Sequence, residues 1–260
     1  AFIESNKESL LLPDALLRKA VCLWNLKKYP ECIEILKPLA EKTPRIADEA
    51  HLWMGKAQLS TADKTKPEAY TASLKAAMDS FNKALAILKP LTATDPKAKQ
   101  RQTEITIHLA DTQMLAKNYK DAAANYQQLL AAGAGAGDKR SEQLLYRQAT
   151  TLHLAEQFKE SDALCAKFLT SYPESVLQPQ VRFRMAENSF FQAAALEKSL
   201  PPEIKDRDAQ IKKAFQETAG RYQLVVDKYP NFEHANLARL GLGASLYRTG
   251  TFKGVDAILA

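Results

Sequence analysis

The residue types that carry out catalysis or bind metals are spread too widely in this sequence to predict an active site. The four histidines fall on, or just before, four different expected helices: His51, His108, His153 and His234. No His-x-x-x-His pair offers metal ligands on one helix face, and no Gly-x-Ser-x-Gly turn is present to expose a nucleophile. Carboxylates such as Glu156 lie within helices and are expected to be solvated or hydrogen-bonded. We therefore predict a protein that is not an enzyme, with no catalytic, cofactor-binding or metal-binding residues and no cofactor.

A glycine-rich run at residues 133–138 resembles a phosphate-binding loop only superficially. Such a loop follows a strand, and a Lys followed by Ser or Thr opens the next helix. Here a helical pattern precedes Gly133, and Lys139 and Arg140 follow Asp138. The dinucleotide-binding version fails as well, because Asp138 stands where its third glycine would be. We interpret the run as a flexible linker between two helical hairpins.

The cysteines and the charge indicate little specialised chemistry. Cys22, Cys32 and Cys165 all fall on expected apolar helix faces, and their odd number and wide spacing disfavour a disulfide framework or a metal site. We expect them to be small buried hydrophobes. The net charge of +6 is spread along the chain without a block of like charge, so a nucleic-acid partner is not expected.

Nothing in the sequence fixes the compartment. No apolar run approaches the roughly 18 residues that a membrane span needs, and no signal peptide is visible at Ala1. The amphipathic pattern is still running at Ala260, so we interpret the chain as a fragment. We expect membrane association only through an anchor outside it.

The dominant feature is an internal repeat of two amphipathic helices. The first helix carries a small residue near its middle, at positions 20, 55, 110, 149, 186 and 243. A short turn ends in an aromatic residue, as at Tyr29, Tyr119 and Phe158, with Phe252 in the last repeat. The second helix has spaced apolar positions, and a proline often follows. The repeats are predicted at 13–44, 46–90, 98–132, 141–173, 178–230 and 235–260, the last one truncated.

Two of these repeats are longer than the others. Their extra residues lie around 60–73 and 197–208, which we interpret as insertions at two turns. One hairpin cannot bury both of its apolar faces alone, and stacking on the next hairpin buries them. The chain is therefore predicted to be a single all-α array of stacked hairpins.

The repetition resembles the tetratricopeptide-repeat (TPR) family over nearly the whole chain. The resemblance implies an all-α, right-handed superhelical solenoid of antiparallel helix pairs, with about five and a half repeats of which two are stretched. The second half also resembles bacterial envelope proteins of the BamD/YfiO and YbgF/CpoB type. This second resemblance rests on the aromatic-Pro pairs Tyr172-Pro173 and Tyr229-Pro230, followed by Ala235 and Ala238. It implies a cell-envelope assembly adaptor and favours the periplasm or cell envelope over the cytoplasm.

In a TPR solenoid the first helices line a concave groove, and helical spacing predicts which side chains face it. The candidates mix aromatic residues with isolated charges, which suits binding of a peptide or helix. The predicted groove residues are Trp24, Asn25, Lys56, Asp111, Met114, Tyr146, His153, Phe183, Glu187, Phe190, Tyr247 and Arg248.

The sequence thus predicts a non-catalytic protein–protein interaction scaffold that binds a segment of a protein partner in this groove. Two alternatives remain open. The repeats could be a purely structural arm, or they could be the accessory domain of a larger protein or enzyme. The partner and the oligomeric state are not predicted.

Overall fold

The computed structural model describes residues 2–6, 8–133 and 139–250, and these residues form helices and connecting turns without any strand. In chain order the helices are α1 Phe2–Ser5, α2 Leu12–Asn25, α3 Tyr29–Lys42, the 3₁₀ turn η1 Pro44–Ile46, α4 Ala47–Ser60, α5 Pro67–Leu88, α6 Pro96–Leu115, α7 Tyr119–Ala131, α8 Lys139–Leu154, α9 Phe158–Ser171, α10 Gln178–Ser199, α11 Arg207–Lys228 and α12 Ala235–Arg248. Within these ranges, no helix is both long enough and apolar enough to cross a membrane. Most of the predicted linker, at 134–138, and Phe252 lie outside the described residues.

The helices pack as consecutive antiparallel pairs, which confirms the predicted all-α fold of stacked hairpins. Each helix from α2 to α7, and from α8 to α12, packs mainly on its neighbours in sequence. The six predicted small residues fall on α2, α4, α6, α8, α10 and α12, and all six are buried. These are the first helices of the repeats, and α3, α5, α7, α9 and α11 are the second helices.

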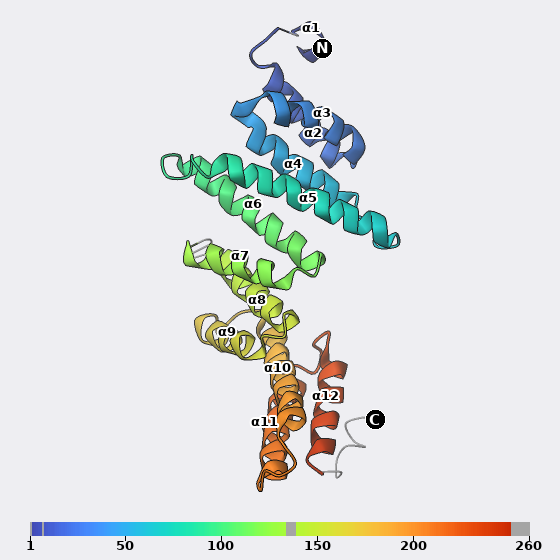
Figure 1. Ribbon diagram of the computed structural model, residues 1–260, viewed down its shortest axis with the longest axis vertical. Helices are drawn as coiled ribbons and strands as arrows, with labels where there is room; N and C mark the ends of the chain where they lie inside the picture. The colour runs from blue at the N-terminus through green and yellow to red at the C-terminus, as the bar shows by residue number, and fades with distance from the viewer. Residues whose placement is uncertain (1, 7, 134–138, 251–260) are drawn as a thin grey trace. The chain divides into compact units, whose positions relative to one another are not determined.

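Contacts between helices group the chain into two compact units, Ala1–Ala134 and Gly135–Ala260. Unit 1 contains α1 to α7 and unit 2 contains α8 to α12 (Figure 1). Each unit has its own core, as expected for a repeat array in which every hairpin contacts mainly its neighbours.

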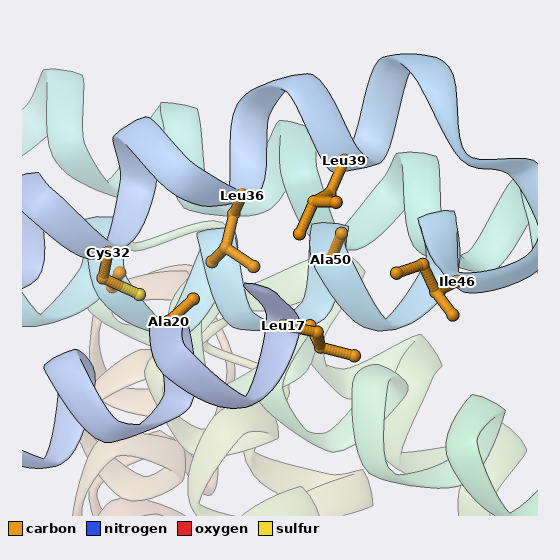
Figure 2. Close-up of a cluster of buried hydrophobic side chains, with 8 residues drawn as sticks. Leu17, Ala20, Cys32, Leu36, Leu39, Ile46 and Ala50 are labelled. Atoms are coloured by element: carbon orange, nitrogen blue, oxygen red, sulfur yellow. The ribbon is translucent and has the colours of Figure 1, made fainter. Parts of the chain in front are cut away.

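The core at the start of unit 1 shows how two hairpins share one apolar layer. Side chains from α2, α3 and α4 meet around Ala20, Leu36 and Ala50, each with no exposed surface (Figure 2). Cys32 belongs to the same cluster, and burial raises the pKa of its thiol to about 11. Cys165 is buried in unit 2, but Cys22 is exposed, so the prediction was wrong for Cys22. All three thiols are free.

The two long repeats owe most of their extra length to longer helices. Helix α5 has 22 residues where α3 has 14, and it resumes the helical pattern at Pro67, well inside the expected insertion. In unit 2, α10 and α11 have 22 residues each, and only residues 200–206 link them. The extra residues continue an amphipathic pattern, so burying their apolar side stabilises added helical turns more than a loop would.

The turns within three of the hairpins share one backbone conformation. Lys27, Lys117 and Glu156 have φ angles of 61°, 62° and 60°, the left-handed region that closes a helix C-terminus. The next backbone N–H reaches back in each case, as Lys28 N–H does to the Leu23 carbonyl at 2.9 Å. The predicted turn aromatics Tyr29, Tyr119 and Phe158 then begin the second helices.

Two first helices approach an aromatic ring so closely that only glycine fits. A Cβ atom on Gly55 would lie 2.4 Å from Phe81 Cε1, and one on Gly241 would lie 2.4 Å from Tyr222 Cζ. Both rings are buried. Phe81 lies on α5, the second helix of the repeat that contains Gly55, whereas Tyr222 lies on α11, the second helix of the repeat before Gly241. The close approach in the last repeat is therefore between neighbouring hairpins, at Gly241, two residues before the small residue Gly243 of the repeat pattern.

We predict that Gly241→Ala and Gly55→Ala each lower the free energy of unfolding by about 1–3 kcal/mol, because the added methyl group forces the packed ring to move. Gly220→Ala is the matched control, since a Cβ there meets nothing within 4 Å and the site is in the middle of α11. This control should raise the free energy by up to about 1 kcal/mol through helix propensity. Urea unfolding followed by circular dichroism measures all three. A neutral Gly241→Ala variant would contradict the close-packing argument.

Candidate functional site

The first helices present two kinds of position, which are best described relative to the small residue. Three residues before it, Leu17, Leu52 and Phe183 are between 4% and 7% exposed. The residue one position after the small residue is half-buried in every repeat: Val21, Lys56, Asp111, Thr150, Glu187 and Ala244. Four of the residues two positions before the small residue are half-buried as well, namely Trp53, His108, Arg147 and Arg184. In α2, α4 and α10 one side of the first helix is therefore buried and another side is partly open, whereas Leu240, at the equivalent position of α12, is 57% exposed.

On unit 1 this open side carries both tryptophans of the chain. The rings of Trp24 on α2 and Trp53 on α4 meet edge to face, with centroids 5.5 Å apart. The Lys56 ammonium lies over both rings, 4.1 Å from the Trp53 centroid and 5.6 Å from that of Trp24. A cation over the face of an aromatic ring is attracted by the partial negative charge of the ring's π electrons. The three side chains therefore fix one another's positions.

Helix α6 extends this surface with an acid and an imidazole. Glu104 forms an ion pair with Lys56 at 3.6 Å and lies 3.7 Å from His108 Nε2. The neighbouring His108, and then the Lys56 charge, hold the pKa of Glu104 below its ordinary value. The His108 ring in turn stacks on Phe81, with centroids 5.8 Å apart. We call Trp24, Trp53, Lys56, Glu104 and His108 the unit 1 face.

The other predicted groove residues of unit 1 lie on the same helices as this face. Asn25 follows Trp24 on α2 and is exposed. Asp111 and Met114 are half-buried on α6, and Asp111 accepts a hydrogen bond from the Tyr126 hydroxyl of α7. Asp111 therefore helps to hold its own hairpin together.

In unit 2 two of the predicted groove residues are buried instead. His153 is 8% exposed, and its Nδ1 lies 2.7 Å from Asn188 Oδ1. Asn188 Nδ2 donates to Ser161 Oγ at 2.9 Å, and Ser161 Oγ donates to the Ala149 carbonyl at 2.8 Å. This buried chain of hydrogen bonds joins α8, α9 and α10.

Phe183 is the second buried residue, at 7% exposed, and it packs against Tyr222, Phe232 and His234. His153 and Phe183 thus have little surface to offer a partner, because neighbouring side chains cover each of them almost completely.

The remaining candidates of unit 2 form separate local arrangements. Tyr146 is half-buried on α8. Glu187 pairs with Arg184 at 2.8 Å, and burial raises the pKa of its carboxyl. Phe190 packs on Phe215, with ring centroids 5.7 Å apart.

The last two candidates lie at the end of α12. Tyr247 is 65% exposed. Arg248 pairs with Glu197 of α10, and its guanidinium carbon lies 5.5 Å from the centroid of the Phe215 ring. Arg248 thereby links α12 to the hairpin of α10 and α11.

Three residues of the unit 1 face were missed by the sequence reasoning, namely Trp53, Glu104 and His108. The predicted set used positions three residues before the small residue and one, four and five residues after it. Trp53 and His108 both lie two residues before it, on the adjacent edge of the same helix stripe. Large polar or aromatic side chains recur at this position, and that recurrence was the signal available in the sequence. In the described part of the chain, no group of three or more His, Cys, Asp or Glu side chains is placed to hold a metal ion.

The buried His153 predicts a pH dependence of stability. Burial, and then the nearby Arg184 charge, lower its pKa from the ordinary value of 6.5. The folded state thus stays neutral at pH values where the unfolded chain takes up a proton. This contribution to stability is complete above pH 6.5 and is lost as the pH falls through the folded-state pKa.

We expect the free energy of unfolding to fall below pH 6.5, by at most about 1.4 kcal/mol per pH unit for this one group. His153→Gln keeps a hydrogen-bonding side chain but cannot take up the proton, so its curve should fall less steeply. Urea unfolding at several pH values between 7.5 and 5 makes the comparison. His51 also has a pKa lowered by burial, but it is present in both proteins and cancels. Parallel curves for the two proteins would contradict the assignment.

Comparisons with known proteins give structural neighbours only. No protein-family model matches the chain, and no curated protein matches it. Among solved structures, BtubC (BKLC) from P. vanneervenii is 15% identical, with 94% of this chain and 88% of that one covered and a TM-score of 0.45. The human IFIT1 dimer with m7Gppp-AAAA is 13% identical with a TM-score of 0.46. The match covers 97% of this chain and 60% of IFIT1, so the chain spans less than two thirds of that protein. A computationally designed self-assembling cyclic homo-oligomer is 12% identical, with 95% and 96% covered and a TM-score of 0.27.

Proposed function

We propose that this protein is a non-catalytic scaffold that binds a segment of a partner protein, and that the unit 1 face is a binding surface. The observation that supports this most is the gathering of Trp24, Trp53 and Lys56 from successive first helices into one half-buried patch. Tryptophan is among the commonest anchors of protein interfaces, since it buries a large area at a low cost in conformational entropy.

A protein segment suits this patch better than a nucleic acid does. Lys56 is already paired with Glu104, and the pair carries no net charge to attract a phosphate backbone. The patch instead offers aromatic faces next to one cation and one anion, which matches an amphipathic segment with an apolar side chain and neighbouring polar groups.

We further propose a cell-envelope assembly adaptor as the specific role, with the periplasm or cell envelope as its compartment. This part rests on the resemblance of the second half to envelope proteins and on nothing in the geometry. In the alternative of a structural arm, the repeats would only support a larger assembly, and the unit 1 face would bind no free segment.

The test uses the fact that Trp24 and Trp53 are the only tryptophans in the chain. Peptides of 12 residues without tryptophan are selected from a random display library on the immobilised protein. Each selected peptide is then titrated against the protein in solution while the intrinsic tryptophan fluorescence is recorded. We expect binding to change this fluorescence, and Lys56→Glu to weaken binding at least tenfold because it reverses the charge over both rings.

Lys75→Glu is the matched control, because Lys75 is an exposed lysine on the second helix α5 and the variant carries the same change in net charge. It should bind as the unaltered protein does. The proposal fails if selected peptides leave the tryptophan fluorescence unchanged, or if the two lysine variants bind them equally well.

A further inference from the structure

Unit 2 contains a cleft of about 620 Å³ that the predicted groove does not include. It is lined by the first turns of α9, the second half of α10 and the middle of α11. The volume lies within the range of about 300–1,000 Å³ that is typical of ligand sites.

The lengthened hairpin creates this cleft. Phe191 of α10 stacks almost parallel on Phe158, the first residue of α9, with ring centroids 5.0 Å apart. Helix α10 runs antiparallel to α9 and continues to Ser199, so residues 192–199 extend past the start of α9. Because α11 accompanies α10 over this stretch, the two longer helices and the blunt end of the shorter one enclose the space.

The floor of the cleft is apolar and its rim is acidic. Phe158, Ala193, Leu196 and Ala214 supply apolar surface. The charged side chains that line it are Glu156, Lys159, Glu160, Asp162, Glu217 and Arg221. Four of these six are carboxylates, in a chain whose net charge is +6.

The cations of the rim do not balance these carboxylates. Arg221 donates to Asp162 at 2.6 Å and to the Met185 carbonyl at 3.1 Å, which fixes that pair at one wall. Glu156, Glu160 and Glu217 remain, all exposed, against Lys159 alone. An anionic ligand would meet this excess of carboxylates, so the N-terminus of α9 is a poor anion site despite its dipole.

We propose that this cleft binds a segment of a partner protein that presents a lysine or arginine next to an aliphatic side chain. The aliphatic side chain packs on Phe158 and Leu196, and the cation lies among the carboxylates of Glu156, Glu160 and Glu217. A long basic side chain suits both parts, because its methylene stem is apolar and its end is charged.

The experiment titrates the ¹⁵N-labelled chain with the capped tetrapeptide acetyl-Leu-Arg-Leu-Lys-amide and records amide chemical shifts. Shifts are expected at amides that line the cleft, such as Ser189, Gln192 and Glu217. Acetyl-Leu-Glu-Leu-Glu-amide should produce none of them. Acetyl-Gly-Arg-Gly-Lys-amide keeps the charges but lacks the apolar side chains, and it should bind at least threefold more weakly.

Two matched double variants test the role of the carboxylates. Glu160→Lys with Glu217→Lys should weaken binding of the basic peptide at least tenfold. Glu174→Lys with Glu203→Lys makes the same change in net charge at exposed residues outside the cleft and should leave the affinity within twofold. Equal weakening by both pairs, binding of the acidic peptide, or shifts elsewhere in unit 2 would overturn the proposal. Tryptophan fluorescence reports on unit 1 alone, so this outcome is distinguishable from failure of the unit 1 face.

Discussion

The close approach of the two helices within each hairpin is the constraint on which the rest of the structure depends. A helix can approach its partner closely only where a residue has almost no side chain, as Gly55 does under Phe81. Once that contact is fixed, the sides of the first helix are fixed too. One side stacks on the next hairpin, and another faces away from both contacts. The surface left for binding is thus a consequence of packing, and its side chains can vary without disturbing the fold.

Much of the fold could be predicted from the sequence because stacking positions repeat. Ala20, Ala149 and Ala186 recur at similar spacing, and each is buried as the pattern requires. The candidate site was harder to predict. The positions of Trp24 and His153 are equivalent in the repeat, four residues after the small residue, yet Trp24 is half-buried and His153 is buried. Which neighbour covers such a residue depends on contacts such as that of Asn188 with His153, and helical periodicity carries no information about them.

Polar groups are used in two ways in this structure. In unit 2 the chain from His153 through Asn188 to Ser161 is satisfied internally, and it specifies how three helices fit together. In unit 1 the Lys56 and Glu104 side chains meet near the surface, where Glu104 keeps half of its side-chain area exposed. An internal network adds rigidity, whereas an exposed pair can exchange partners at small cost. Polar side chains therefore serve the fold in the buried network and remain available for recognition in the exposed pair.

The lengthened helices have a consequence for how such a chain can diversify. Helix α5 is eight residues longer than α3, which is slightly more than two turns of helix. The repeat positions Ala77, Phe81 and Ala84 in the later part of α5 are all buried, so the longer helix keeps the packing of the repeat. Longer helices in both arms of a hairpin then project beyond the shorter neighbours and enclose new space beside them. Growth of the helices gives a repeat protein a route to fresh cavities that leaves its existing packing in place.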